Sequence, residues 1–394
     1  MRFFFQLRSV NGLAMNSRCG RKPPDSSMKI VHVIDSGGLY GAEQMLLALV
    51  AEQLRQGLKP MILSITVPQS EPKAFFLEAQ RRGLPVISWP MAKGFNLCGA
   101  AQLLSWCQVR EYFLVHSHGY RFDILFNCLP RRNRQFQFIS TVHGFTAHRR
   151  FSRVMVYQWL NRVCLLRGHR VVAVSQGLQK QLRHRAGVAF IPNGLPSLLL
   201  DQTATPIEAP QGPFLLALGR LSVEKAYHRL IGAFADSNAV GEGWHVVIAG
   251  EGNQKELLQA LVKKRGLEAR VHFVGYTHDA QAWLQQAAGL VISSDTEGLP
   301  MVLLEAMRLK TPVIATPVGE IPQVLKNGAL GFLAAACDQQ SLTASINRLL
   351  SEPEQAAAMK KAARHCFEEH YTAEVMARRY HSVYRELLKN DPVY

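Results

Sequence analysis

Two glutamates, a glycine and a proline share one short string in the second half of the chain. The string runs Ser293-Ser-Asp-Thr-Glu-Gly-Leu-Pro-Met-Val-Leu-Leu-Glu-Ala-Met307 and follows an apolar segment that predicts a strand. Pro300 is typical of a first helical turn, so Glu297 is predicted just before a helix and Glu305 in its second turn. A helix start favours an anion such as phosphate, and carboxylates on either side of it can accept hydrogen bonds from sugar hydroxyls.

A second cluster carries fixed positive charge. Leu218-Gly-Arg220-Leu-Ser-Val-Glu-Lys225 comes directly after a predicted strand, which is the usual position of ligand loops in alternating α/β proteins. Arg220 and Lys225 could neutralise a diphosphate, and the guanidinium of arginine can bind two phosphate oxygens at once. A surface salt bridge between Lys225 and Glu224 is the alternative.

A glycine-rich loop follows the first predicted strand. It reads Ser36-Gly-Gly-Leu-Tyr-Gly-Ala-Glu43, and glycines there allow the backbone to approach a ligand closely. The spacing differs from Gly-x-Gly-x-x-Gly, so it does not indicate a nicotinamide site.

These strings, together with several others, give the chain a resemblance to a known family. It resembles the retaining, nucleotide-sugar-dependent glycosyltransferases of family 4 (glycosyl transferases group 1), which have the two-domain GT-B fold and include many enzymes of bacterial polysaccharide biosynthesis. The resemblance runs from about residue 28 to residue 386. The matching motifs, in chain order, are Gly37–Glu43, Thr141-Val-His-Gly144, Val174-Ser-Gln-Gly177, Ile191-Pro-Asn-Gly194, Gly219-Arg220 with Glu224-Lys225, Gly250-Glu-Gly252, Phe273-Val-Gly275, and Glu297 with Glu305.

The resemblance implies roles for the matching residues of the second half. Arg220 and Lys225, after Gly219, would hold the donor diphosphate and stabilise it as it leaves. Glu305 would bind the ribose hydroxyls. The transferred sugar and the β-phosphate would be positioned by a carboxylate and the backbone that follows it, namely Glu297, Gly298 and Leu299.

The resemblance also implies that the first half completes the site. His143 would reach the sugar, and Gly38 or Gly41 would leave room for the phosphates. Two departures from the family pattern concern loop geometry. Ala226 stands where the family usually has glycine, and the spread of Gly37-Gly-Leu-Tyr-Gly41 blurs which residue touches phosphate.

The chemistry expected at such a site needs no metal ion and no other cofactor. Cleavage of a glycosyl–phosphate bond develops negative charge on the diphosphate, and preorganised cations and helix N–H groups lower that barrier. Asp295-Thr-Glu297 resembles a metal-binding acidic pair, but no second acidic cluster lies near it in the sequence. Front-face attack and double displacement both remain open.

The predicted elements that must position these residues alternate between strand and helix. Short apolar runs predict strands at 29–34, 61–67, 86–89, 113–116, 138–142 and 170–174, and again at 214–218, 245–249, 271–274, 290–292 and 313–315. Apolar strands separated by helices indicate parallel sheets covered on both faces. Four prolines between 196 and 213 mark a linker. The predicted fold is therefore α/β, with two Rossmann-like doubly wound domains facing each other across a cleft.

The expected domain limits follow from these patterns. Residues 1–27 are predicted to be a disordered extension, 28–200 an acceptor-side domain, 201–213 the linker and 214–375 the nucleotide-sugar domain. The helical region 352–388 ends in a segment, 376–394, that could return to the first domain. Seven scattered cysteines without a Cys-x-x-Cys pair favour reduced thiols in the cytoplasm.

The net charge of +16 is unevenly distributed. Residues 28–205 hold 21 basic and 8 acidic side chains, whereas residues 206–394 hold 19 and 20. The first domain is therefore expected to meet an anionic partner, such as a lipid-diphosphate-linked or other anionic glycan acceptor at the inner membrane face. A basic amphipathic segment at 148–163 and Arg131, Arg132 and Arg134 fit that peripheral contact. A helix packed on the domain core explains the segment equally well.

Three alternatives to a glycosyltransferase were weighed. A nucleotide-sugar epimerase on the same fold would turn over donor without acceptor, and a non-catalytic module would bind nucleotide without releasing it from the sugar. Nucleic-acid binding is disfavoured, because no recognition helix, zinc motif or aromatic stacking string is found. His116 and His118 end a predicted strand, where a cleft position and a structural position are both open.

Overall fold

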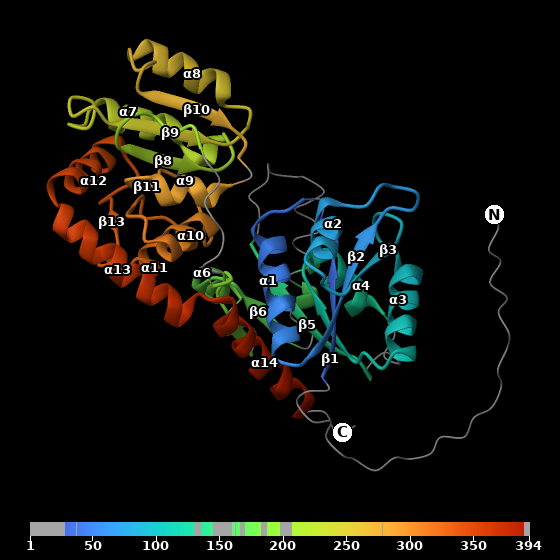
Figure 1. Ribbon diagram of the computed structural model, residues 1–394. Coiled ribbons are helices and arrows are strands. Elements are labelled where there is room, and N and C mark those ends of the chain that lie inside the picture. Colours follow the sequence, from blue (N-terminus) through green and yellow to red (C-terminus); the bar gives the residue numbers. More distant parts are fainter. Residues whose placement is uncertain are drawn as a thin grey trace, which may run out of the picture.

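The computed structural model describes residues 28–36, 38–129, 135–144, 160–161, 163–165, 170–182, 187–197, 207–277 and 279–389. Several predicted features lie outside these residues: the extension 1–27, Gly37, Arg131, Arg132 and Arg134, nearly all of the basic segment 148–163, and part of the linker. Within the described residues the chain forms two lobes, each built on one sheet (Figure 1).

The first lobe is a parallel seven-stranded sheet in the order β3-β2-β1-β4-β5-β6-β7. Its strands are β1 (Lys29–Ile34), β2 (Lys59–Thr66), β3 (Val86–Pro90), β4 (Leu114–Ser117), β5 (Gln137–Val142), β6 (Arg170–Ala173) and β7 (Val188–Phe190). The helices in its described part are α1 (Gly41–Arg55), α2 (Ala74–Arg81), α3 (Leu97–Val109), α4 (Tyr120–Cys128) and α6 (Gln176–Gln181).

The second lobe is a parallel six-stranded sheet in the order β10-β9-β8-β11-β12-β13. Its strands are β8 (Phe214–Leu218), β9 (His245–Ala249), β10 (Val271–Gly275), β11 (Gly289–Ile292), β12 (Val313–Ala315) and β13 (Phe332–Leu333). Its described helices are α7 (Tyr227–Ala235), α8 (Lys255–Lys264), α9 (Ala280–Gln286), α10 (Met301–Leu309), α11 (Ile321–Val324), α12 (Gln339–Ser351) and α13 (Pro353–His370).

Both sheets are buried on two faces, as expected for doubly wound domains. Along β1, Ile30 belongs to one apolar cluster, while its neighbour Val31 belongs to the cluster on the opposite face. Leu215 and Leu216 of β8 divide in the same way between the two clusters of the second lobe. Successive strand residues point to opposite faces, so a continuous apolar run is required. In each lobe the strand order reverses beside the first strand, which confirms the predicted α/β fold with two Rossmann-like domains.

The chain passes between the lobes twice, and the two passages are hydrogen-bonded to each other. Leu195 N donates to Tyr371 O at 2.9 Å, and Ala373 N donates to Leu195 O at 2.8 Å. Leu195 and Thr372 form a parallel bridge. The predicted helical region is therefore two helices, because the chain leaves the helical conformation at Tyr371 and Thr372 between α13 and α14 (Ala373–Lys389).

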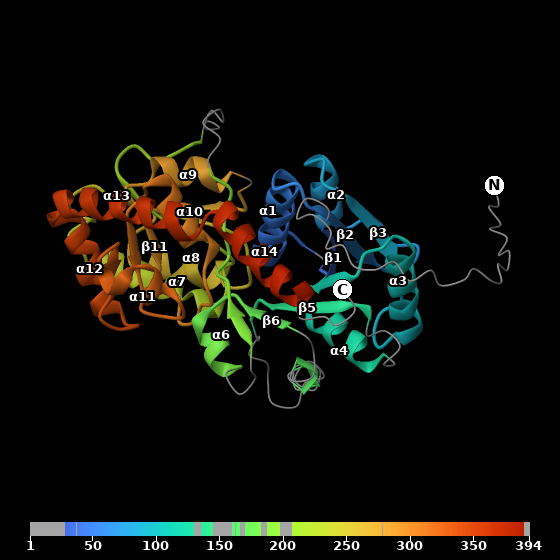
Figure 2. The ribbon, with the colours of Figure 1, turned by 90° about the horizontal axis from the view of Figure 1, so that it is seen from below.

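Helix α14 leaves the second lobe and packs along α1 of the first (Figures 1 and 2). Its buried residues recur at intervals of three and four, which places them on one face of the helix. They join Ile30 and Met45 in a single apolar cluster. The buried residues of this face are Ala373, Met376, Ala377, Tyr380, Val383 and Tyr384.

Beneath α14 lies a buried polar network that contains three histidines. Tyr384 OH accepts from Gln53 Nε2 at 3.3 Å and pairs with His116 Nδ1 at 2.8 Å. His32 pairs with Gln53 Oε1 at 2.9 Å through Nε2 and with His118 Nε2 at 3.1 Å through Nδ1. Because Gln53 Oε1 can only accept, His32 carries its proton on Nε2, and His118 Nε2 then donates to His32 Nδ1.

One assignment of protons to neutral imidazoles is therefore compatible with all the hydrogen bonds of this network. His116 Nε2 pairs with Thr141 Oγ1 at 2.7 Å, and Thr141 Oγ1 pairs with Tyr380 OH at 2.9 Å. Ligand atoms of His32, His116 and His118 lie within 4.8 Å of one another, a spacing that could hold a metal ion. Both ring nitrogens of His32 and of His116 already have partners, so an ion there would have to displace hydrogen bonds that tie α14 to the sheet.

Burial keeps these imidazoles neutral. Desolvation lowers the pKa of His32 from 6.5 to about 4, and it lowers the pKa of His116 and His118 well below 6.5. In the unfolded chain all three titrate near their ordinary value. Between pH 6.5 and 4 the unfolded state thus binds more protons than the folded state, so the free energy of unfolding falls as the pH falls through this range.

We predict that His32→Gln reduces this pH dependence. Removal of one such group should lower the slope of unfolding free energy against pH by up to about 1.4 kcal/mol per pH unit between pH 6.5 and 4. Urea titrations at several pH values measure the slope. His365→Gln on α13, with a side chain 72% exposed, is the matched control for removal of an imidazole from the surface. Equal slopes for His32→Gln and the natural protein would contradict the assignment.

Candidate nucleotide-sugar site

Three ion pairs lie at the carboxyl ends of β8 and β11 of the second lobe, in the loops that follow these strands and at the start of α7. Lys225 Nζ lies 2.7 Å from Glu297 Oε1. Arg229 and Asp295 are separated by 2.5 Å, and the most exposed pair joins Arg220 to Glu224 at 3.2 Å. Each cation therefore already has a carboxylate partner within the described chain.

The two predicted cations pair with different carboxylates, and neither pair is the alternative salt bridge between Lys225 and Glu224. Glu224 pairs with Arg220, whose side chain is 73% exposed, whereas Lys225 turns inward to Glu297. Glu297, the partner of Lys225, lies 72 positions further along the chain. The structure therefore brings together Lys225 and Glu297, two residues to which the resemblance gives roles around the same diphosphate.

A left-handed residue positions Lys225. After β8 the chain makes a short 3₁₀ turn over Val223–Lys225, and Ala226 then adopts φ 47° and ψ 41°. This conformation costs alanine roughly 1–2 kcal/mol, and glycine adopts it without that cost. Ala226 is fully buried, so its packing holds the conformation that the family usually obtains with glycine. The substitution therefore leaves the turn that presents Lys225 intact.

The loop that carries Glu297 is fixed by its neighbours. Ser294 Oγ donates to Glu297 Oε1 at 2.6 Å, and Arg229 Nη1 donates to Ser293 O at 2.8 Å. Gly319 lies against this loop with φ 58°, and a Cβ there would stand 2.2 Å from Glu297 O. Only glycine fits such an approach, and Glu320 N then donates to Gly298 O at 2.9 Å. Ser294, Arg229 and Gly319 were not singled out in the sequence, because each acts by supporting another residue.

The loop after β8 is held by a second close glycine contact. Gly250 follows β9 with φ 150°, and a Cβ on it would stand 1.9 Å from Gly219 O. Gly219 N donates to Ala249 O at 3.0 Å, which ties the two loops together. The Gly250-Glu-Gly252 motif therefore places Gly219 and the residues after it at the strand ends.

Tyr227 was also missed by the sequence analysis. Its side chain is buried, and its hydroxyl lies 3.1 Å from the position that a Cβ of Gly219 would occupy. The hydroxyl has no hydrogen-bond partner within the described residues. Burial raises the pKa of this phenol, and the charge of Glu297 raises it further, so the hydroxyl keeps its proton and can donate it to a ligand oxygen.

Glu305 lies in the second turn of α10, as predicted. Pro300 caps this helix from the preceding position, with the helix itself beginning at Met301. Burial raises the pKa of the Glu305 carboxyl above its ordinary value, and the charge of Arg308 opposes that shift. A desolvated carboxylate is stabilised by hydroxyl donors, so this residue suits a sugar or ribose edge. Of the two backbone sites predicted beside Glu297, Gly298 faces open space, and Leu299 packs against the second-lobe core.

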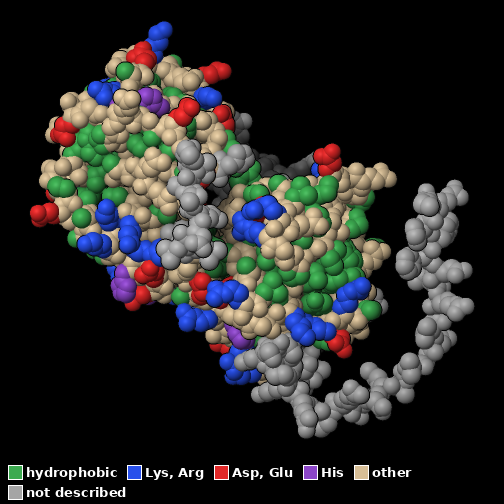
Figure 3. Space-filling view, in the orientation of Figure 1, with side chains coloured by type: hydrophobic (Ala, Val, Ile, Leu, Met, Phe, Trp, Pro, Cys, Tyr) green, Lys and Arg blue, Asp and Glu red, His purple; other side chains and the backbone are tan. Residues whose placement is uncertain are grey.

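The first lobe meets this site along the carboxyl ends of its strands. Gly41, after β1, lies against α10: a Cβ there would stand 2.9 Å from Met301 Cγ. Gly177, after β6, donates its N–H to Glu320 Oε1, which follows β12, at 2.8 Å. Since every contacting segment follows a strand of its own sheet, the carboxyl edges of the two sheets face each other. Figure 3 shows the notch between the lobes.

Two other predicted residues of the first lobe lie near this edge. His143 follows β5, and its ring stands 5.9 Å from that of His118. Burial lowers the pKa of His143 to about 4, so its imidazole is neutral, and neither ring nitrogen has a hydrogen-bond partner within the described residues. Gly38 lies beside the Tyr40 ring at the start of α1. Gly41 therefore contacts the other lobe, whereas Gly38 packs against Tyr40 of its own lobe.

Two family descriptions match the chain, one for each lobe. "Glycosyltransferase Family 4" matches residues 40–197, and "Glycosyl transferases group 1" matches residues 204–366. Together they span both sheets and the motifs quoted above. No helix of the described residues is both long and apolar enough to cross a membrane.

Curated relatives match parts of the chain. A glycogen synthase of Mycobacterium tuberculosis is 28% identical over 246 residues, which cover 57% of each protein. N-acetyl-alpha-D-glucosaminyl L-malate synthase of Bacillus anthracis is 30% identical over 146 residues, which cover 37% of this chain and 38% of the relative. The chain thus spans only 23% to 57% of the length of the first curated relatives it matches.

Solved structures share the whole fold. The glycosyltransferase of Rickettsia africae superimposes with a TM-score of 0.77 at 18% identity, covering 93% of this chain and 100% of that one. Anabaena Alr3699/HepE, crystallised with UDP, gives a TM-score of 0.76 at 18% identity, with 91% and 100% covered. On the fold, the facing strand ends and the two matching descriptions, the chain belongs to the GT-B glycosyltransferases of the group 1, family 4 type.

Proposed function

We propose that this protein transfers a sugar from a nucleotide-diphosphate donor to a hydroxyl of a glycan or lipid-linked acceptor, with retention of anomeric configuration. The observation that carries the proposal is the inward ion pair of Lys225 and Glu297 at the carboxyl edge of the second sheet. The names of the relatives support it. The Anabaena protein was crystallised with UDP and with UDP-glucose, and one relative is named as a putative colanic acid biosynthesis glycosyltransferase.

The reaction uses the ion pairs in the following way. The donor diphosphate displaces the carboxylates of Glu224 and Glu297 from Arg220 and Lys225, because the two adjacent negative charges of the diphosphate together attract a cation more strongly than one carboxylate does. The bond between the anomeric carbon and the β-phosphate oxygen breaks, and that oxygen takes up the electron pair. Lys225 and Arg220 stabilise the charge that develops on it, so metal-independent catalysis is part of the proposal.

The remaining residues bind and orient the reactants. Glu297, released from Lys225, accepts hydrogen bonds from hydroxyls of the transferred sugar, and Glu305 accepts them from the ribose. His143 contacts the sugar from the first lobe. The acceptor hydroxyl forms the new bond to the anomeric carbon and loses its proton, which leaves with the nucleotide diphosphate or to solvent. The products are a glycoside and a nucleotide diphosphate, in cell-surface polysaccharide synthesis at the cytoplasmic membrane face.

The test is nucleotide release from a panel of donors. UDP-, GDP- and ADP-sugars are incubated with the full chain, with and without a lipid-linked glycan acceptor, and free nucleotide diphosphate is quantified. A glycosyltransferase releases nucleotide faster when acceptor is present. An epimerase converts the donor sugar without acceptor and releases no nucleotide, and a binding module does neither. Either of the latter results would overturn the proposal.

We predict that Lys225→Ala lowers kcat by about 100-fold or more, because the lost charge acts mainly on the leaving diphosphate in the transition state. Initial rates of nucleotide release measure it. The control is Lys263→Ala on α8, which removes the same charge from an exposed surface and should keep the natural rate. An unchanged kcat in Lys225→Ala would rule out the role assigned to this ammonium.

Glu305→Gln should act differently, because ribose binding is the same in the ground state and the transition state. We expect KM for the donor to rise about tenfold with a much smaller change in kcat. The amide is nearly isosteric; it removes the charge of a largely desolvated carboxyl and replaces one of its two acceptor oxygens with a donor. A fall in kcat at constant KM would instead place Glu305 at the reacting centre.

A further inference from the structure

A cavity of about 560 Å³ opens in the first lobe at the carboxyl ends of β1, β2 and β4. Its walls are largely apolar, with Ile65 and Phe122 among the lining residues. Phe95 and Tyr120 also line it, and they are 58% and 46% exposed. A space of this size holds one or two sugar rings, and exposed aromatic faces suit the apolar faces of such rings.

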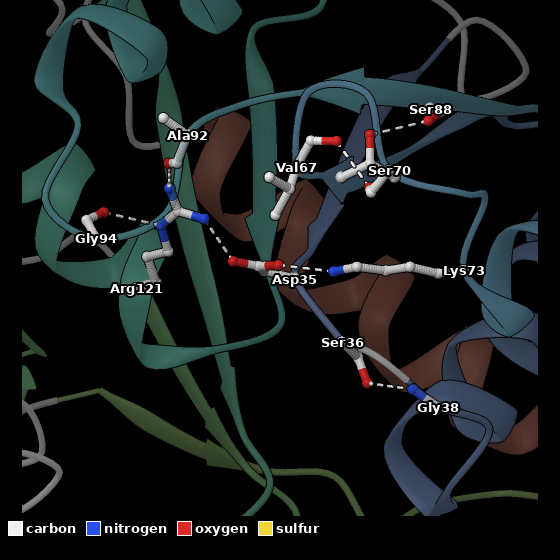
Figure 4. A network of polar contacts seen from close by, with 11 residues as sticks. Asp35, Ser36, Gly38, Val67, Ser70, Lys73, Ser88, Ala92, Gly94 and Arg121 are labelled. Atoms are coloured by element: carbon white, nitrogen blue, oxygen red, sulfur yellow. Dashed lines mark hydrogen bonds and ion pairs between the residues drawn. The ribbon is translucent and has the colours of Figure 1, made fainter.

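Four charged residues line this cavity, and three of them are cations. Asp35 accepts from Lys73 Nζ at 2.8 Å on one carboxylate oxygen and from Arg121 Nη1 at 2.5 Å on the other (Figure 4). Lys93 is exposed and forms no ion pair with another described residue. With Lys73, Lys93 and Arg121 against Asp35, the lining carries a net charge of +2.

The cations are held in place by more than Asp35. Arg121 Nε donates to Gly94 O at 3.1 Å, and Arg121 Nη2 donates to Ala92 O, so the guanidinium joins the start of α4 to the loop after β3 (Figure 4). Lys73 uses one of its three N–H donors on Asp35. Burial alone would raise the pKa of Asp35, but the hydrogen bonds and charges of Lys73 and Arg121 keep it below its ordinary value. The cluster thus stays ionised, with donors left over.

The cavity adjoins the proposed reaction centre. Asp35 directly precedes the glycine loop, whose Gly41 touches α10 of the second lobe. His118 lines the cavity, and its ring stands 5.9 Å from that of His143. The Nδ1 atom of His118 has no hydrogen-bond partner within the described residues. A sugar in this cavity can therefore present a hydroxyl toward His143 and the donor.

We propose that this cavity is the acceptor subsite and that it selects glycans bearing an anionic group, either a uronate carboxylate or a phosphate. The anion pairs with Lys73 and Lys93, while the sugar ring lies against Phe95 and Tyr120. A neutral sugar would leave the surplus positive charge without a partner. The inference rests on the proposed glycosyl transfer and adds the chemical class of the acceptor.

The test compares three probes with the full chain in the presence of a saturating nucleoside diphosphate (UDP, GDP or ADP, whichever binds), which keeps anions out of the donor site. Binding of glucose, glucuronate and glucose 6-phosphate is measured by calorimetry. We expect both anionic probes to bind at least about tenfold more tightly than glucose, and preference for one over the other identifies carboxylate or phosphate. Equal affinity for all three would overturn the proposal.

A matched pair of double variants tests whether the anionic group binds at Lys73 and Lys93. Lys73→Gln/Lys93→Gln should abolish the preference over glucose, whereas Lys263→Gln/Lys264→Gln on α8 removes the same charge elsewhere and should retain it. Lys93→Gln alone changes only an exposed side chain, and it should lose part of the preference without any effect on folding. An equal loss in both double variants would show a general charge effect and sink the assignment.

Different results would contradict the glycosyl-transfer proposal and the acceptor-subsite proposal. Binding of UDP, GDP and ADP is measured first, in the same calorimeter. If none of the three nucleotides binds but anionic sugars are still preferred, the glycosyl-transfer proposal is wrong, and the cavity is an anion site of another activity. If one of them binds and the lysine variants change nothing, glycosyl transfer stands, and the acceptor is recognised without charge.

Discussion

The structure depends on charge balance at the carboxyl edge of the second sheet. Lys225, Arg229 and Arg220 each have a carboxylate partner, so the cations are ordered without an anionic ligand. Unpaired, a half-buried ammonium such as that of Lys225 would be costly, and the loop would lose its geometry. The same pairing makes the site selective, because a ligand must outcompete a carboxylate held at 2.7 Å. A diphosphate carries enough charge to do so, whereas a single neutral sugar does not.

Glycine contacts turn this balance into a defined shape. Gly250 and Gly319 allow backbone from neighbouring strand ends to approach Gly219 and Glu297 more closely than any side chain would permit. The positions of the charged groups are therefore set mainly by the packing of the backbone and depend little on flexible side chains. The first lobe uses another device for the same purpose: neutral buried histidines joined by hydrogen bonds fix β1, β4 and α14 relative to one another.

The sequence was sufficient for the fold, because strand and helix alternate in local apolar patterns, and it also supplied the charged residues that remain predictions for the site. Apolar runs marked most strands, although β7 and β13, with three and two residues, were not predicted. Pairings could not be predicted, since they depend on which strand ends meet. A salt bridge from Lys225 to Glu224 was the alternative to a diphosphate-binding role, whereas Lys225 lies beside Glu297. Gly319 shows no sequence signal, because its role is a contact with a loop that precedes it by more than 20 positions. For the same reason the sequence could not place α14 or reveal the ion pairs of Asp35.

The two hydrogen-bonded passages between the lobes limit how one lobe can move against the other. Helix α13 packs on the second lobe and α14 on the first, so any movement of one lobe against the other must be absorbed at Tyr371 and Thr372 and beside them at Leu195. Two adjacent segments tied by two hydrogen bonds can rotate together but cannot separate without breaking those bonds. The bridge is therefore the place where a rotation of one lobe against the other would cost least, because both passages would turn as one unit there.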